Sequence, residues 1–139
     1  MAGIRGKDTK PERLLRSALH AQGMRYRLHV RELPGRPDIV LPRYRTVILV
    51  HGCFWHRHSG CRFAAMPETR QEFWVEKFAA TVARDKRNVE ALSLAGWRVA
   101  IVWECAIKAV GAIVIAGSIA AWIRDADSDL VRTWSSKSN

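Results

Sequence analysis

Three histidines and two cysteines lie within residues 51–61, although the whole chain has only five histidines and three cysteines. Thiolates and imidazoles are preferred zinc ligands, and a structural zinc site needs four of them. We predict Cys53, His58, Cys61 and Cys105 as these four ligands. Two alternatives remain: another histidine of the segment in place of His58, or free buried cysteines beside surface histidines. Zinc held by four protein ligands would be structural and would not act in catalysis.

This ligand set leaves His51 and His56 without a role, and histidine often serves as a general base or acid. Asp38 begins a short apolar run at 38–41, and His51 follows the run TVILV at 46–50. If these two runs pair as a hairpin, Asp38 and His51 lie at the same edge. A carboxylate there could bind magnesium beside a histidine, an arrangement that can hydrolyse a phosphodiester. The alternative for Asp38 is an ordinary turn residue after Pro37.

Phe54 and Trp55 stand between the predicted zinc ligands. On a basic protein, aromatic side chains that project from a loop can wedge between base steps and unstack them. We favour this interpretation; the alternative is that both side chains pack against the zinc module.

Basic residues are concentrated in the part of the chain that carries these motifs. The formal net charge is +10, and residues 1–62 hold 13 of the 23 Lys and Arg but only 4 of the 13 Asp and Glu. This asymmetry predicts a polyanionic partner, because phosphate contacts supply most non-specific affinity for nucleic acid. Arg5, Lys7 and Arg36 are among the cations expected to hold phosphates.

Hydrophobic periodicity predicts the elements that must position these residues. In chain order, we expect a helix capped by Thr9 and ended by Gly23, strands at 24–30, 38–41 and 46–50, helical sequence from Thr69 to about Leu94, a strand at 98–103 and a buried helix at 109–123. Residues 1–8 would be a flexible basic arm and 130–139 a frayed end. The 139 residues fit one α/β (α+β) domain, in which helices flank a mixed central sheet.

Two other classes of protein are disfavoured. The uncharged run at 109–123 has 15 residues, whereas a membrane span needs about 20. The N-terminus has no apolar secretory segment, and the cysteine count is odd, so we expect a reducing compartment and no disulfide framework.

Four strings of the sequence resemble the very-short-patch mismatch-repair endonucleases: IRGKDTKPE at 4–12, PGRPD at 34–38, VHGCFWH at 50–56 and WRVAIVWEC at 97–105. The resemblance covers about residues 1–108. It implies a restriction-endonuclease-like fold and a bacterial, cytoplasmic role at the nucleoid. It also implies magnesium-dependent nicking of duplex DNA, 5′ of the thymine in a T:G mismatch left by deaminated 5-methylcytosine.

The resemblance also assigns roles to residues. Asp38 matches the family's magnesium-binding aspartate, and the backbone carbonyl of Val50 is expected to share the ion. His51 and His56 match active-site histidines, and Glu12 matches an active-site glutamate. From the sequence alone, Glu12 is a helix-capping residue. The zinc ligands and the inserted aromatics of the family match the residues assigned above.

Three positions depart from the family's pattern. Val50 replaces an expected threonine, one more residue than expected separates His58 from Cys61, and only Met1 could contact DNA from the opposite groove, as the family's N-terminal arm does.

Three other functions fit the same residues. A zinc module that binds nucleic acid without catalysis would show salt-sensitive binding and no magnesium-dependent product. A zinc hydrolase of small molecules would need an open zinc position. A nicking enzyme of relaxed specificity would cut other mismatches. In each case we expect a monomer that does not enter a membrane.

Overall fold

The computed structural model describes residues 9–125 and 127–136. Its five strands form one mixed sheet in the order β1-β2-β3-β4-β5. The β1/β2 and β2/β3 pairs are antiparallel, and the β3/β4 and β4/β5 pairs are parallel. In chain order the elements are α1 (Lys10–Ala21), β1 (Arg27–Leu28), β2 (Ile39–Leu41), the 3-10 turn η1 (Pro42–Tyr44), β3 (Thr46–His51), α2 (Gln71–Leu94), β4 (Arg98–Trp103), α3 (Glu104–Val110), α4 (Ala112–Arg124) and β5 (Val131–Trp134).

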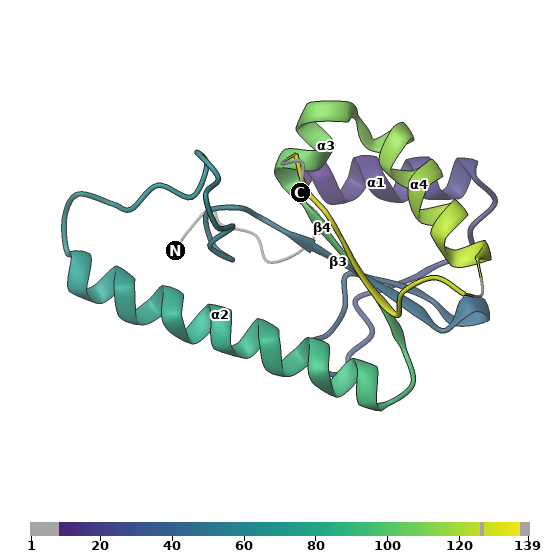
Figure 1. Cartoon of the computed structure of the whole chain (residues 1–139), viewed down its shortest axis with the longest axis horizontal. Helices are drawn as coiled ribbons and strands as arrows, with labels where there is room; N and C mark the ends of the chain where they lie inside the picture. Colours follow the sequence, from purple (N-terminus) through teal and green to yellow (C-terminus); the bar gives the residue numbers. More distant parts are fainter. Residues whose placement is uncertain (1–8, 126, 137–139) are drawn as a thin grey trace.

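Helices cover both faces of the sheet, as predicted. Figure 1 shows α1, α3 and α4 together on one face, with the long helix α2 on the other. This arrangement follows from the parallel β3/β4 pair, because parallel neighbours need a crossover connection, here supplied by α2.

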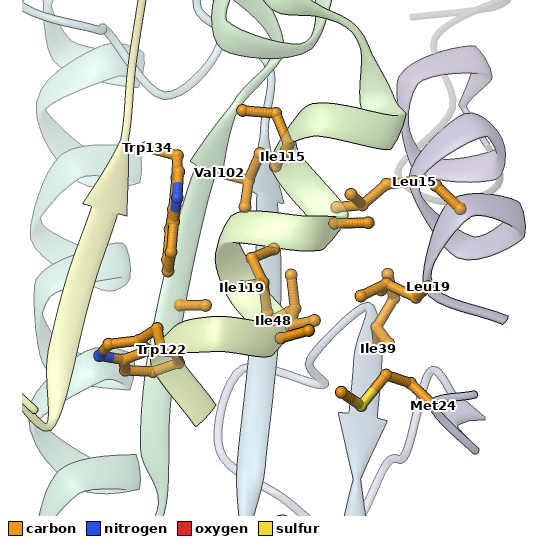
Figure 2. Close-up of a cluster of buried hydrophobic side chains, with 14 of the residues drawn as sticks. Leu15, Leu19, Met24, Ile39, Ile48, Val102, Ile115, Ile119, Trp122 and Trp134 are labelled. Carbon is orange, nitrogen blue, oxygen red and sulfur yellow. The ribbon is translucent and has the colours of Figure 1, made fainter. Parts of the chain in front are cut away.

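The larger hydrophobic core lies between the sheet and α1, α3 and α4. Figure 2 shows how α1 and α4 contribute side chains to it, which meet Ile39, Ile48 and Val102 from the central strands. Leu15 and Leu19 of α1 are fully buried because they stand four residues apart on one helix face. Burial of each such side chain stabilises the fold by roughly 1.5–3 kcal/mol.

A smaller core lies beneath the C-terminal half of α2. Leu92 of the helix belongs to one buried cluster with Val40, Val47, Leu49 and Val99 of the sheet. Of the residues of α2, only Phe78 and Leu92 are buried, so most of this helix is solvated. Its N-terminal half extends beyond the sheet towards the segment that follows β3 (Figure 1).

The central strands bring the sequence motifs to one edge of the sheet. The run TVILV forms most of β3, which pairs with β2 on one side and β4 on the other. Its continuous apolar character fits a strand that helices cover on both faces. In the parallel β3/β4 register, His51 faces Trp103. The segment after β3 and the helix α3 after β4 therefore begin side by side.

Two predicted elements differ in extent. The strand predicted at 24–30 is limited to Arg27–Leu28, because His29 takes a left-handed conformation with φ of 48° and leaves the sheet. The helix predicted from Thr69 begins at Gln71 after a left-handed Arg70 and lacks a side-chain cap. By contrast, Thr9 caps α1 as predicted, accepting a hydrogen bond from the Glu12 backbone N–H.

The buried helix predicted at 109–123 is present as α4, which begins at Ala112, but the separate helix α3 before it was not predicted. The chain forms α3 and α4, which are bent by 113° relative to each other at Gly111. Gly111 has φ of 88° and ψ of 150°, a conformation that is essentially restricted to glycine. Within the described residues, no single helix is long and apolar enough to cross a membrane, and only this bent pair reaches the required length together.

The frayed end predicted at 130–139 is not found at Val131–Trp134, within the part of the chain that the structure describes. Val131–Trp134 forms β5 and pairs with β4. Trp134 is 9% exposed, and its indole N–H donates to the Ser118 hydroxyl at 2.9 Å. The sequence did not predict this strand because only one of its residues, Trp134, is buried, so it shows no apolar alternation.

Candidate active site and metal centre

Cys53, His58, Cys61 and Cys105 form one cluster, although 52 residues separate the first from the last. Their ligand atoms all lie within 4.8 Å of one another. Cys53 and His58 come from the turns after β3, and Cys105 comes from the first turn of α3. Three of the four are buried. The donor set and the burial both fit a structural zinc ion.

The surroundings of His58 fix its ring for this role. Its Nδ1 lies 3.4 Å from the Cys105 sulfur, and its Nε2 lies 3.0 Å from the Ser135 hydroxyl. The Trp103 ring stacks on it at a centroid distance of 4.2 Å. A zinc-binding histidine needs such a partner on its second nitrogen to hold its orientation. Nδ1 is therefore the nitrogen that faces the cysteines.

The Cys53 thiol supports the presence of a cation in this cluster. Burial raises its pKa to about 12, so it would stay protonated unless a positive charge compensates. A divalent cation provides that charge and binds the thiolate.

The predicted hairpin between the runs at 38–41 and 46–50 is confirmed. Ile39 pairs with Ile48, so the register places Asp38 opposite Leu49, one residue before Val50, at the end of the hairpin. One carboxylate oxygen of Asp38 accepts a hydrogen bond from the Val50 N–H at 2.8 Å. The turn PGRPD thus places the Asp38 carboxylate against the backbone of β3.

Asp38, His51 and His56 all line one cavity of about 550 Å³. Arg36 also lines it, together with two cations that the sequence did not single out, Arg31 and Arg84. The structure therefore brings three of the four predicted catalytic residues into one cavity, which three arginines also line.

Glu12 also lies at this site. It is 2% exposed, and its carboxylate contacts Arg16 at 3.2 Å and His29 at 3.3 Å. Glu12, His29 and Asp38 form a group whose ligand atoms lie within 4.8 Å of one another.

The electrostatics of Asp38 favour a bound cation. Burial and, less strongly, the neighbouring Glu12 carboxylate raise the pKa of Asp38 to about 7, against the opposing hydrogen bond from Val50. Two carboxylates in one buried place repel each other, and a divalent cation relieves that repulsion. The residues present thus fit the predicted magnesium ion.

His51 and His56 stack in parallel at a centroid distance of 4.0 Å. Burial and, less strongly, the neighbouring His56 lower the pKa of His51 to about 3, which favours the neutral imidazole. Its Nδ1 is buried and, within the part of the chain that the structure describes, makes no hydrogen bond. An unpaired polar atom in the wall of a cavity is available to a ligand.

Asp85 is a site residue that the sequence analysis missed. It stands on α2 and lies 2.6 Å from Nδ1 of His56. His51, His56 and Asp85 form another group of close ligand atoms. In the sequence, Asp85 lies in the charged run RDKR, which is typical of the solvated face of a helix. Nothing in this run indicates that the Asp85 side chain lies towards His56 and not towards solvent.

Phe54 and Trp55 pack on α2 and remain partly exposed. Phe54 meets Phe78 at a centroid distance of 5.2 Å, and Trp55 meets Trp74 at 5.7 Å. Arg57 lies over the Phe78 ring at 4.0 Å. Both side chains thus pack on aromatic residues of α2, whereas insertion into DNA stays a prediction. Trp74, which the sequence analysis missed, belongs to this aromatic cluster.

Three predicted DNA-contacting residues, Met1, Arg5 and Lys7, lie outside the described residues.

Known proteins similar to this chain are DNA mismatch endonucleases and type II nicking enzymes. Residues 1–62 match the family model described as DNA mismatch endonuclease Vsr. The chain is 50% identical over 113 residues to the type II nicking enzyme V.XorIIP of Xanthomonas oryzae, covering 81% of this chain and 82% of that protein. It is 49% identical over 108 residues to DNA mismatch endonuclease Vsr of Escherichia coli, covering 78% and 69%. It is 44% identical over 108 residues to the type II nicking enzyme V.NmeAIP of Neisseria meningitidis, covering 78% and 76%.

Proposed function

The chain belongs to the Vsr family of DNA endonucleases and nicking enzymes, and we propose that it nicks duplex DNA 5′ of the thymine in a T:G mismatch. Such a mismatch arises when 5-methylcytosine deaminates, so the nick would start very-short-patch repair. The observation that supports this proposal is the single cavity in which Asp38 lies with His51 and His56.

Asp38 is the residue proposed to hold magnesium, together with the backbone carbonyl of Val50. The contact between the Asp38 carboxylate and the Val50 backbone supports this pairing. When bound, magnesium would neutralise charge on the scissile phosphate and make a nearby water molecule more acidic. Glu12 would orient groups around the ion from its buried position.

His56 is the proposed proton acceptor for the attacking water. With a proton on Nδ1 donated to Asp85, Nε2 is left as the acceptor nitrogen. As the water oxygen bonds to phosphorus, its proton would pass to Nε2 of His56. The bond from phosphorus to the leaving oxygen would break, and that oxygen would take up a proton from solvent in the open cavity. Asp85 would stabilise the imidazolium that forms, as a carboxylate does for a catalytic histidine.

His51 would act without changing its charge. Its neutral ring stacks on His56, and its unpaired Nδ1 can form a hydrogen bond with a phosphate oxygen or with water in the cavity. The stacking also limits the positions that the His56 ring can take.

DNA would be held by cations and opened by aromatics. Arg31, Arg36 and Arg84 line the cavity and can contact phosphates, and Arg5, Lys7 and Met1 would add contacts from the N-terminal arm. Phe54 and Trp55 would insert at the mismatch, where unstacking costs least. Their partial exposure is compatible with that step.

Zinc would hold the turns after β3 rigid and so position His56 and the aromatics. A Cys3His site needs reduced thiols, which suits the bacterial cytoplasm. We expect a monomer to suffice, because all the residues proposed for the reaction come from one chain.

The experiment that tests this function uses zinc-loaded protein, magnesium and a panel of end-labelled duplexes that each carry one mismatch. We expect one nick, in the thymine strand of the T:G duplex, and no product from the matched duplex. Salt-sensitive binding without any magnesium-dependent product would instead identify a non-catalytic nucleic-acid-binding module.

A nicking enzyme of broader specificity is the second candidate. It is favoured because two of the similar proteins are named type II nicking enzymes. In the same panel it would cut several mismatches at rates within about tenfold of one another, a difference of about 1.4 kcal/mol in transition-state binding.

A further inference from the structure

A histidine without an assigned role stands at the proposed magnesium site. His29 Nε2 lies 3.3 Å from Oε2 of Glu12, and both residues belong to the close group completed by Asp38. The resemblance on which the other roles rest assigns nothing to His29.

The backbone holds His29 in this position. It follows β1 with a left-handed φ of 48°, and its N–H donates to the Asp38 carbonyl at 3.2 Å. The side chain is 23% exposed and lines the same cavity as His51. The ring is thus fixed beside the carboxylates and is still open to an ion that enters from the cavity.

We propose that His29 is a protein ligand of the metal held at Asp38, and that it makes this site prefer Mn²⁺ and Co²⁺ to Mg²⁺. This inference rests on the proposed function, because it concerns the same catalytic cavity. Glu12 completes a set of one imidazole and two carboxylates.

The spacing fits such a set. Neighbouring ligands of an octahedral ion with bonds of about 2.1 Å are about 3 Å apart. The separation of 3.3 Å between His29 and Glu12 is close to that value, so only small side-chain rotations would close both around an ion.

The ligand chemistry sets the preference. Magnesium is bound through oxygen atoms and keeps several of its waters, so it gains little from an imidazole. First-row transition ions accept imidazole nitrogen readily, with affinity rising from Mn²⁺ to Co²⁺. An all-oxygen site would hold Mg²⁺ and Mn²⁺ more equally.

The test measures metal binding directly, without DNA. Full-length protein, with zinc already in its Cys3His cluster, is titrated with Mn²⁺ while electron paramagnetic resonance reports free Mn²⁺; Mg²⁺ is then added as competitor. The variants are His29→Gln, which removes the proposed ligand, and His20→Gln as a matched control on the exposed side of α1. Circular dichroism verifies that both variants fold.

We expect His29→Gln to weaken Mn²⁺ binding by at least about tenfold and to change Mg²⁺ binding by less than about twofold. The control should match the unaltered protein. Equal Mn²⁺ affinity in His29→Gln and the unaltered protein would overturn the proposal, as would the absence of any Mn²⁺ preference over Mg²⁺.

Failure of this inference differs from failure of the proposed function. If only the inference is wrong, Mg²⁺ still supports T:G nicking by the unaltered protein, and Mn²⁺ shows no advantage in binding. If the proposed function is wrong, no nick appears with either ion, whatever the binding experiment gives.

Discussion

At the scale of single residues, the site depends on charges that are placed in unfavourable surroundings. The Asp38 carboxylate is buried against that of Glu12, and the His51 ring has lost its usual basicity. Such arrangements cost folding free energy and persist where a ligand or reaction uses them. Replacing Asp38, or the Asp85 carboxylate that contacts His56, should therefore lower the nicking rate and leave the fold intact.

Asp38→Asn should lower the rate of magnesium-dependent nicking by at least about 10²-fold, because the variant loses the charge that holds the cation. The fold should persist, since the amide oxygen can still accept the hydrogen bond from Val50. Single-turnover nicking measures the loss, and circular dichroism together with zinc content measures the fold. A rate within tenfold of the unaltered protein would remove Asp38 from its proposed role.

Asp85→Asn should lower kcat by about 10²-fold or more and leave KM for DNA nearly unchanged. The neutral amide no longer carries the negative charge that would stabilise the imidazolium form of His56. Glu76→Gln, an exposed position on the same helix, is the matched control and should behave as the unaltered protein. A change confined to KM would mean that Asp85 contributes to DNA binding instead.

At the scale of elements, the segment between β3 and α2 has no regular structure of its own apart from turns. It is held by the Cys3His cluster, by the aromatic packing on α2, and by Arg57, whose guanidinium donates to the carbonyls of Phe54, Ala64 and Ala65. The cluster joins this segment to α3, so metal affinity and local folding should be coupled.

Cys105→Ala should abolish stoichiometric zinc and destabilise the protein by on the order of 4 kcal/mol, since a metal ligand and its loop restraint are lost together. Zinc content is measured by atomic absorption, and stability by urea denaturation. Unaltered protein stripped with a chelator is the matched comparison, and it alone should recover on addition of Zn²⁺. Intact protein purified without any zinc would contradict the assignment of the cluster.

At the scale of the whole molecule, two cores on opposite faces of the sheet support one catalytic edge. The larger core is completed by the C-terminal strand β5, whose Trp134 packs on Trp122 of α4 at a centroid distance of 5.5 Å. Next to this strand, the Ser135 hydroxyl contacts the zinc-cluster ligand His58. The end of the chain therefore stabilises both the core and the metal centre.

Trp134→Ala should destabilise the protein by about 3–5 kcal/mol, the usual cost of removing a large buried aromatic side chain. Leu130→Ala is the control, because Leu130 is 65% exposed and its truncation should cost less than about 0.5 kcal/mol. Thermal and urea unfolding measure both variants. Equal stability of the two would show that β5 is dispensable for the fold.

The sequence by itself determined the parts of this site that are local in the chain. The turn before Asp38, the run TVILV and the clustered cysteines and histidines are short strings whose chemistry depends on residue type and spacing. The Asp38 hairpin, the mixed sheet and the zinc ligands within 51–61 could therefore be predicted, and Cys105 was added to them by residue type, as the third cysteine.

Only the tertiary structure decided which distant side chains join these strings. Asp85 reaches His56 across 29 residues, and His29 meets Glu12 only because the short strand β1 ends beside α1. Similarly, β5 is held by one buried tryptophan and by its pairing with β4. Such contacts depend on the register and packing of separate elements, and periodicity within one segment carries no information about them.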